Sequence, residues 1–538
     1  MKKIIALLEK RYVKFIFLAV SGILTGLTVC FPVLGFLEWF SIIPMALVLL
    51  SLCESENHRL RSLYAYGLFY FMCYFVVTWH WFYVMYPMSY TGMTELAALS
   101  VLIAAMLGLP FVQAWLFAFS FVFARLIYRG YLMKKLKMLF PFIFAAIWTI
   151  LEWCQTLFWF GVPWGRLSIG QTSILVTAQT ASLFGCYFIT FLLVSVNFLL
   201  AYAIFKYDAR KLFALTAAAV FSFNVISGSI IMLTDSADDS ERHITVAAVQ
   251  GNISTAEKWD DNWFEKTTDA YKRLTKEAVD NGADVIIWPE TVIPVADIYS
   301  YASSFAFITR LANELDVTLI VGTNVMNDDS DMFNSLIVVY PDGSIDDKFY
   351  AKQNLVPFGE YMPMKELLSV IIPSLTEVNI MGDEWTPGNS STVIDIGNAK
   401  MGSAICFDSI YDATVRKSII NGAEFIVIST NDSWFYDSAA TTMHLGQAKL
   451  RAIENGRYVA RSASTGISAI INANGQAIDI EPPLTEGYAI SEISLRQSRT
   501  LYSYIGNIFV YLLISAICAI VTTDIIIKYK IKKEKKDD

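Results

Sequence analysis

Long apolar runs separated by short polar segments occupy the first 235 residues of this chain. Most runs are close to the ~20 residues that an α-helix needs to cross the ~30 Å hydrocarbon core of a bilayer. The pattern predicts seven membrane-spanning helices, followed by an eighth near the C-terminal end of the sequence. The predicted spans are 13–30, 33–52, 63–84, 97–124, 138–158, 181–205, 212–233 and 503–526.

The pattern changes at about residue 236, where short apolar runs begin to alternate with helical stretches. Runs that are apolar on both faces are typical of central strands in an α/β sheet covered by helices. Strands are predicted at 243–250, 284–289, 317–323, 335–340, 401–406, 425–429, 458–462 and 468–472, and helices around 264–280, 302–314, 410–421 and 443–455. We therefore expect a transmembrane domain (1–235), an α/β domain (236–498), and a last helix with a basic tail (499–538).

The composition supports a membrane protein that carries a polar domain. Of the 538 residues, 55% are hydrophobic and only 17% are charged, which is too apolar for an ordinary soluble protein. The net charge of −8, without an extended basic patch, argues against nucleic acid as a partner.

Loop charges predict the orientation of the helices. Lys and Arg precede the first predicted helix and fill the loops after the second, fourth and sixth, whereas the alternate loops contain almost none apart from Arg166. Positively charged loops remain in the cytoplasm. Both ends of the chain are therefore expected inside the cytoplasmic membrane, and the α/β domain outside it.

Cys406 is the only one of seven cysteines in the predicted α/β domain, where it ends the run Met401-Gly-Ser-Ala-Ile-Cys-Phe-Asp408. A single cysteine of this kind is often a buried structural thiol. Two other strand ends change this interpretation, because Glu290 follows Trp-Pro, and Lys352 is followed eight residues later by Glu360. A base, a cation and a thiol are the groups that a nucleophilic cysteine needs.

The sequences around these residues resemble the signature of a known superfamily. Trp288-Pro-Glu290, Lys352 with the following Leu355-Val-Pro-Phe-Gly-Glu360, and Ile405-Cys406 are similar to the Glu–Lys–Cys signature of the nitrilase (carbon–nitrogen hydrolase) superfamily. This resemblance implies an α-β-β-α sandwich.

The resemblance extends over nearly the whole chain to the bacterial apolipoprotein N-acyltransferases. It includes the membrane helices, the loop Gly161-Val-Pro-Trp-Gly-Arg166, and Thr430-Asn-Asp-Ser-Trp-Phe435. It implies a multi-pass protein of the bacterial inner membrane with a periplasmic catalytic domain. No metal site is visible in the sequence, no cofactor is expected, and we expect a monomer.

The family reaction gives each candidate residue a role. Cys406 would attack the acyl ester of a phospholipid, and the thioester would pass the acyl chain to the α-amine of a diacylated apolipoprotein. Glu290 would act as the base, and Lys352 would stabilise both the thiolate and the oxyanion. The backbone N–H of Phe407 would be a second oxyanion donor, and Glu360 would orient Lys352 or assist the amine.

The sequence departs from the family beside the nucleophile, where Cys-Phe407-Asp408 replaces the usual Cys-Tyr-Glu. A backbone donor survives both changes, but roles for the side chains of Phe407 and Asp408 stay open. Trp259 and Trp434 match family aromatics near the lipid site, although core packing would also explain them.

A long, apolar, loop-like stretch at 361–387 includes Met362 and Met364. Loops of this length in a compact domain are usually functional, which predicts a lid that guides acyl chains to the site. Folding back onto the sheet as ordinary core is the alternative.

Two other functions are compatible with parts of the sequence. A membrane-anchored amidase would use the same three residues to hydrolyse a small amide, although one helix would be enough to anchor it. A transporter would instead use polar residues in the spans, such as His80 and Glu152. An acyl-thioester formed with phospholipid would distinguish an acyltransferase from a transporter.

Overall fold

The computed structural model describes residues 7–537 apart from 57, 89–93, 159–160, 235–240, 260–261, 367–369 and 371–384. The chain divides into two compact units. The helical unit comprises Met1–Phe82, Val101–Leu233 and Ile505–Asp538, and the α/β unit comprises Tyr83–Ser100 and Thr234–Tyr504.

Eight helices among the described residues are long and apolar enough to cross a membrane, which confirms the predicted number of spans. They are α2 (Arg11–Cys30), Pro32–Glu54, α5 (Leu60–Thr78), Glu95–Tyr128, Tyr131–Cys154, α12 (Cys186–Phe205), α13 (Arg210–Thr234) and Ile508–Glu534 of α21 (Ile508–Asp537). Three of these spans are composite and contain α4 (Ile43–Glu54), α6 (Glu95–Ile103) with α7 (Leu109–Tyr128), and α9 (Phe140–Cys154).

The predicted span boundaries differ from the observed ones by up to several residues; the sixth span, for example, was expected to begin at 181, but α12 begins at Cys186. Two other differences have a common cause. The third span was expected to reach residue 84, but α5 ends at Thr78 and a 3-10 segment, His80–Met85, follows. The last span was expected to begin at 503, but the short helix α20 (Leu501–Ile505) precedes α21. In both places the helix boundary lies within an apolar stretch of sequence, so a change in hydropathy does not mark it.

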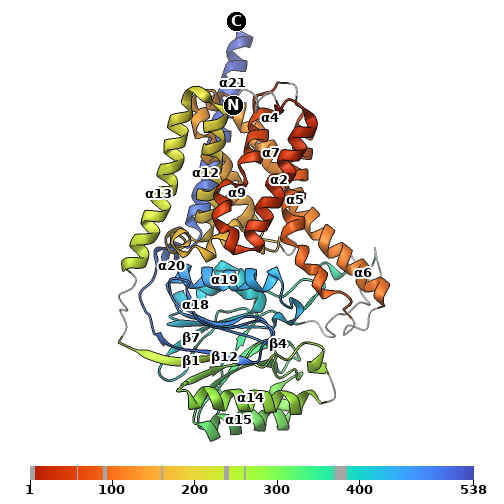
Figure 1. Cartoon of the computed structure of the whole chain (residues 1–538), viewed down its shortest axis with the longest axis vertical. Coiled ribbons are helices and arrows are strands. Elements are labelled where there is room, and N and C mark those ends of the chain that lie inside the picture. Colours follow the sequence, from red (N-terminus) through yellow and green to blue (C-terminus); the bar gives the residue numbers. More distant parts are fainter. Residues whose placement is uncertain are drawn as a thin grey trace. The chain divides into compact units, whose positions relative to one another are not determined.

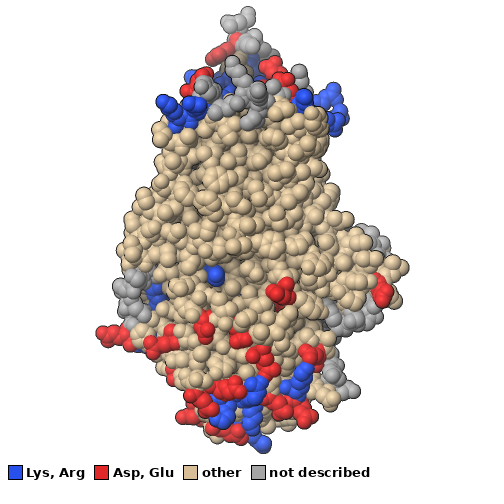
Figure 2. Space-filling model, viewed as in Figure 1, with Lys and Arg blue, Asp and Glu red and all other residues tan. Residues whose placement is uncertain are grey.

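The surface of the helical unit is typical of a membrane-embedded protein. In the view of Figure 2 a broad belt of this unit carries no Lys, Arg, Asp or Glu. Both chain ends lie at one end of the unit (Figure 1), and Lys and Arg side chains gather there. Lipid tails cannot solvate charges, so such a belt is the surface expected to contact hydrocarbon.

Glu152 is held inside the helical unit by hydrogen bonds that join three elements. Its carboxylate accepts from the Thr190 hydroxyl of α12 at 2.6 Å, from the indole of Trp148 at 3.1 Å and from the backbone N–H of Leu167 at 3.2 Å. These contacts satisfy a buried carboxylate and explain its presence in a span by packing, without a transport role.

Two six-stranded sheets form the α/β unit, with parallel strands at their centres. The first has the order β12 (Gly487–Ser494), β1 (His243–Gln250), β2 (Val285–Ile287), β3 (Thr318–Met326), β4 (Met332–Val339), β5 (Tyr350–Ala351). The second has the order β11 (Ala477–Glu481), β10 (Ser468–Ile471), β9 (Val459–Ala463), β8 (Phe425–Thr430), β7 (Lys400–Ile405), β6 (Val393–Asp395).

The sheets form the two inner layers of an α-β-β-α sandwich (Figure 1), as predicted. Apolar side chains of both sheets, such as Val246 and Met401, share the core between them. Helices α14 (Trp263–Asp280) and α15 (Ala302–Leu315) pack against the other face of the first sheet. Helices α18 (Asp412–Ile420) and α19 (Ala439–Asn455) cover the second sheet in the same way.

All eight predicted strands form, but four further strands were missed. Two of them, β5 and β6, have only two and three residues. β11 and β12 are partly exposed along their length, so they lack the continuous apolar run that reveals a central strand.

Candidate active site

The predicted base, cation and supporting carboxylate form one buried cluster. Glu290 follows β2, and Lys352 follows β5. The ammonium Nζ of Lys352 lies 2.9 Å from Oε1 of Glu290 and 2.8 Å from Oε1 of Glu360. All three side chains are buried. A single cation therefore lies between two carboxylates in a place with little water.

Cys406 lies beside this cluster, at the end of β7. It begins the 3-10 turn η10 (Cys406–Ile410) with a φ of +48°. A non-glycine residue takes this conformation rarely, and it persists only where the surroundings enforce it. The residue is partly exposed, and its thiol interacts electrostatically with Glu290 and Lys352. The structure thus brings the three predicted catalytic residues together.

Two asparagines that the sequence analysis missed fix the position of Glu290. Nδ2 of Asn334 donates to Oε1 of Glu290 at 2.7 Å and to Oε1 of Glu360 at 3.2 Å. The backbone N–H of Asn431 donates to Oε2 of Glu290 at 2.7 Å. Both asparagines are far from Glu290 in the chain, so no local pattern could have revealed the contacts.

The electrostatics of the cluster shift the pKa values of its two carboxyl groups in opposite directions. Burial alone would raise the pKa of Glu290, but the charge and hydrogen bond of Lys352 outweigh it and lower the pKa. Burial and repulsion from Glu290 raise the pKa of Glu360, although Lys352 opposes them. Burial disfavours the charge of Lys352, yet both carboxylates hold its pKa well above the ordinary value. Lys352 is therefore a permanent cation.

The thiol of Cys406 is neutral in the resting site. Burial and the negative charge of Glu290 raise its pKa, and the opposing effect of Lys352 is smaller. Lys352 therefore does not by itself lower the pKa of the thiol below its ordinary value, and the role expected of Lys352 beside the thiolate and the oxyanion stays a prediction.

Lys258 is a second buried cation near the site that the sequence analysis did not single out. Its Nζ donates to the backbone carbonyl of Glu290 at 3.1 Å and to the Ser464 hydroxyl at 3.4 Å. Burial lowers its pKa to about 8, although Glu290 opposes the shift. Lys258 directly precedes Trp259, which was chosen only because it matches a family aromatic. This neighbouring position was the one feature of the sequence that could have drawn attention to Lys258.

Asp408 connects the nucleophile turn with the segment that carries Lys352. Its buried carboxylate accepts from the Tyr350 hydroxyl at 2.8 Å, the backbone N–H of Asn354 at 2.7 Å and the backbone N–H of Ile405 at 3.2 Å. Tyr350 and Asn354 flank Lys352 in the chain. The shorter Asp in place of the usual Glu thus still ties the two segments together.

For the remaining predicted residues the structure gives burial and, for Phe407, one packing contact. The Phe407 ring is buried and packs edge-to-face on Tyr411, with ring centroids 5.5 Å apart. Trp434 is partly exposed, and Met362 is partly exposed. Met364 is exposed. The side chain of Trp259 and most of the predicted lid at 361–387 lie outside the described residues, so both remain predictions.

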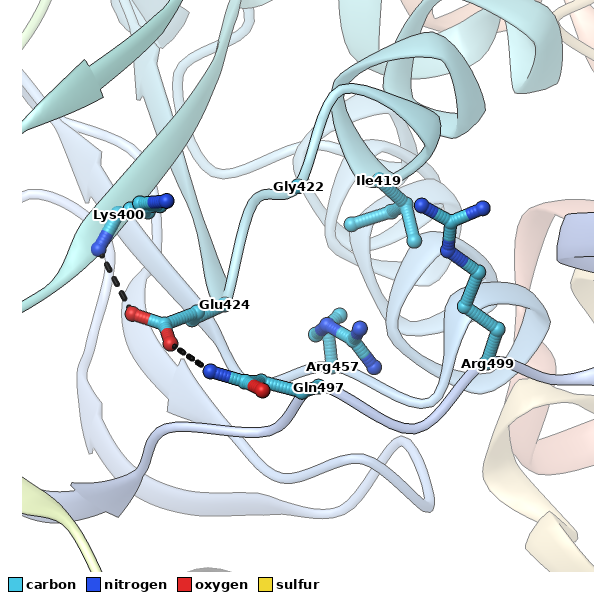
Figure 3. A pocket seen from close by; sticks show the side chains of 7 residues that line it. All are labelled: Lys400, Ile419, Gly422, Glu424, Arg457, Gln497 and Arg499. Carbon is cyan, nitrogen blue, oxygen red and sulfur yellow. Dashed lines mark hydrogen bonds between the residues drawn. The ribbon is translucent and has the colours of Figure 1, made fainter.

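A separate pocket lies elsewhere in the α/β unit (Figure 3). It has a volume of about 290 Å³ and is lined by Lys400, Ile419, Gly422, Glu424, Arg457, Gln497 and Arg499. Its two guanidinium groups bind carbonyls near helix ends: Arg499 donates to Ile420 at 2.9 Å and Arg457 to Ala423 at 3.0 Å. Carbonyls at helix C-termini attract cations, so Arg499 caps α18, which ends at Ile420. The pocket is lined by none of the catalytic candidates.

Comparison with known proteins defines the class. Residues 245–502 match the carbon-nitrogen hydrolase family, and residues 21–199 match the apolipoprotein N-acyltransferase N-terminal domain. The fold and these matches define a membrane-bound enzyme of the nitrilase superfamily.

Two relatives identify the family within this superfamily to which the chain belongs. The apolipoprotein N-acyltransferase of Haemophilus influenzae is 30% identical over 395 residues, which cover 71% of this chain and 74% of that protein. That of Geobacter metallireducens is 27% identical over 518 residues, covering 92% of each chain. The chain belongs to the apolipoprotein N-acyltransferase family.

Proposed function

We propose that this enzyme transfers an acyl chain from a phospholipid, through a thioester on Cys406, to the α-amine of a diacylglyceryl-cysteine at the N-terminus of an apolipoprotein. Family membership supports the substrates. The observation that carries the mechanism is the buried Glu290–Lys352–Glu360 cluster beside Cys406.

In the first half-reaction the sulfur of Cys406 attacks the ester carbonyl carbon of the phospholipid. The proton of the thiol passes to Glu290 as the S–C bond forms. Lys352 and the backbone N–H of Phe407 stabilise the oxyanion; one such donor is typically worth about 3 kcal/mol. The C–O bond then breaks, and Glu290 returns the proton to the departing lysophospholipid.

In the second half-reaction the α-amine of the acceptor attacks the thioester carbonyl. Glu290 takes a proton from the amine, the C–S bond breaks, and Glu290 passes that proton to the leaving sulfur, which restores the neutral thiol. Splitting one acyl transfer into two steps lowers the barrier of each. The same base and the same oxyanion donors serve both steps, because both pass through a tetrahedral intermediate at the same carbon.

The requirement for an amine is the experiment that separates this transferase from a hydrolase. Protein loaded with acyl groups from phospholipid should keep its thioester in buffer and lose it when a diacylated lipopeptide with a free α-amine is added. The matched control is the same lipopeptide with an acetylated amine, whose amide nitrogen has no nucleophilic lone pair. Rapid release of free fatty acid, independent of lipopeptide, would identify an amidase-like hydrolase instead.

We also propose that the α/β unit faces the periplasm. The Lys/Arg-rich loops support this orientation, because they share one side of the predicted topology with both chain ends. In the variant Ser330→Cys, the new cysteine at this exposed position should react with a membrane-impermeant maleimide added from the periplasmic side. The parent chain, treated in the same way, is the control for labelling of the seven natural cysteines. If the cysteine were labelled only after the inner membrane is opened, the α/β unit would face the cytoplasm and the proposed orientation would be wrong.

A further inference from the structure

The peptide group between Cys406 and Phe407 is held from its carbonyl side. The carbonyl oxygen of Cys406 accepts from the Ser409 hydroxyl at 2.7 Å and lies 3.2 Å from Nε2 of His444. Nε2 is also 2.9 Å from the Ser409 hydroxyl, so the three groups form a closed triangle. This peptide directly follows the left-handed residue Cys406.

Holding this carbonyl also determines the direction of a catalytic donor. A trans peptide is planar, with its C=O and N–H pointing in opposite directions. The N–H of the same group belongs to Phe407, the donor assigned to the oxyanion. As the second residue of η10, Phe407 precedes the first intrahelical donor, so the helix does not use this N–H. Hydrogen bonds to the carbonyl also polarise the amide and strengthen its N–H as a donor.

His444 is itself fixed by a buried ion cluster. Its Nδ1 lies 2.9 Å from Oδ1 of Asp432, and the same oxygen accepts from the Thr430 hydroxyl at 2.8 Å. Oδ2 of Asp432 accepts from Nη2 of Arg461 at 2.6 Å. His444, Asp432 and Arg461 are fully buried. Burial opposes the charge of Asp432, but Arg461 and His444 outweigh it and keep its pKa below the ordinary value.

We propose that His444, held by Asp432, is a positioning residue that aims the N–H of Phe407 at the oxyanion. His444 acts through the Cys406 carbonyl and does not touch the substrate. The inference rests on the proposed function, since it concerns the oxyanion of that reaction. Asp432 and Arg461 would be needed only to hold the imidazole ring in place.

Two substitutions of His444 separate positioning from packing. In His444→Gln the side-chain amide reaches about as far as Nε2 and keeps a polar contact with the Cys406 carbonyl. In His444→Asn the shorter amide reaches only the position of Nδ1 and keeps the contact with Asp432. Losing one oxyanion donor costs 10²–10³-fold in rate, so we expect acylation of Cys406 to slow about 100-fold in the Asn variant and less than about 10-fold in the Gln variant.

The readout is the single-turnover rate of acyl-enzyme formation, measured against donor concentration. A positioning role lowers the maximal rate and leaves the half-saturating donor concentration unchanged. His243→Asn, a change on β1 outside the site, is the matched control and should keep the parent rate. Equal losses in both His444 variants, or an unchanged rate in the Asn variant, would overturn the proposal.

A second variant keeps the test decisive if His444→Asn does not fold. Ser409→Ala removes the other hydrogen bond to the same carbonyl and also the contact of the hydroxyl with Nε2 of His444. It should slow acylation about 10-fold, and an unchanged rate would contradict the proposal. An activated p-nitrophenyl acyl ester, used as the donor, separates failure of the proposed function from failure of the proposed role of His444. If the parent protein were acylated by this ester but not by phospholipid, the proposed function would fail. The acylation rates of the His444 variants with the ester would still test the positioning role.

Discussion

Replacing Cys406 by alanine is expected to abolish acyl transfer while the protein still folds and inserts into the membrane. No other thiol lies in the α/β unit, because the remaining six cysteines occur at positions 30, 53, 73, 154, 186 and 518. Without the sulfur no thioester forms, and direct attack of the amine on the phospholipid ester loses covalent catalysis. Turnover of a fluorescent diacylated lipopeptide should fall to the level without enzyme.

The matched control for this change is Cys154→Ala, which removes a partly buried thiol from α9. It should keep near-normal turnover, and both variants should show the same detergent-extracted yield and thermal unfolding within a few degrees. An alanine variant at Cys406 that turned over at a near parental rate would disprove covalent catalysis by this residue.

Replacing Lys352 by methionine is expected to damage both catalysis and stability. The change removes the proposed oxyanion donor and leaves Glu290 and Glu360 buried without their shared cation. Breaking a buried ion pair in this way typically costs about 3–5 kcal/mol, and the rate should fall by at least about 10³-fold. Lys352→Arg should also fail, because a planar fork cannot replace a compact ammonium between two carboxylate oxygens.

A double variant separates the two effects of losing Lys352. Adding Glu360→Gln to Lys352→Met removes one uncompensated carboxylate, so thermal stability should recover in part while transfer activity stays lost. Normal activity in the Met variant, measured with the same lipopeptide assay, would show that Lys352 is not an oxyanion donor. Normal activity in the Arg variant would show that a compact ammonium is not required.

The membrane spans and the central strands could be predicted because a simple physical requirement fixes their sequence. A helix in hydrocarbon needs about 20 apolar residues, and a strand buried on both faces needs an unbroken apolar run. Neither requirement applies to the edge strands β11 and β12 or to the chain between Thr78 and the following 3-10 segment. The prediction from sequence failed at these places, and it also missed the very short strands β5 and β6.

The candidate catalytic residues could be found because each follows a strand and carries a reactive group. Their supports could not, since Asn334 and His444 reach the site only through tertiary packing. His444 lies within α19, 38 residues after Cys406, and nothing local distinguishes it from an ordinary helical histidine. Asp408 was noticed only for its position beside Cys406, and the contacts with Tyr350 and Asn354 explain why a carboxylate stands there.

The most direct test of the account is the mass of the intact protein after incubation with a phospholipid of defined acyl chains and no acceptor. We predict an increase equal to one acyl group, located by peptide mapping on Cys406 and removed by neutral hydroxylamine, which cleaves thioesters. An unmodified Cys406 in protein that nevertheless acylates a lipopeptide, or an acyl group found on another residue, would contradict the thioester mechanism.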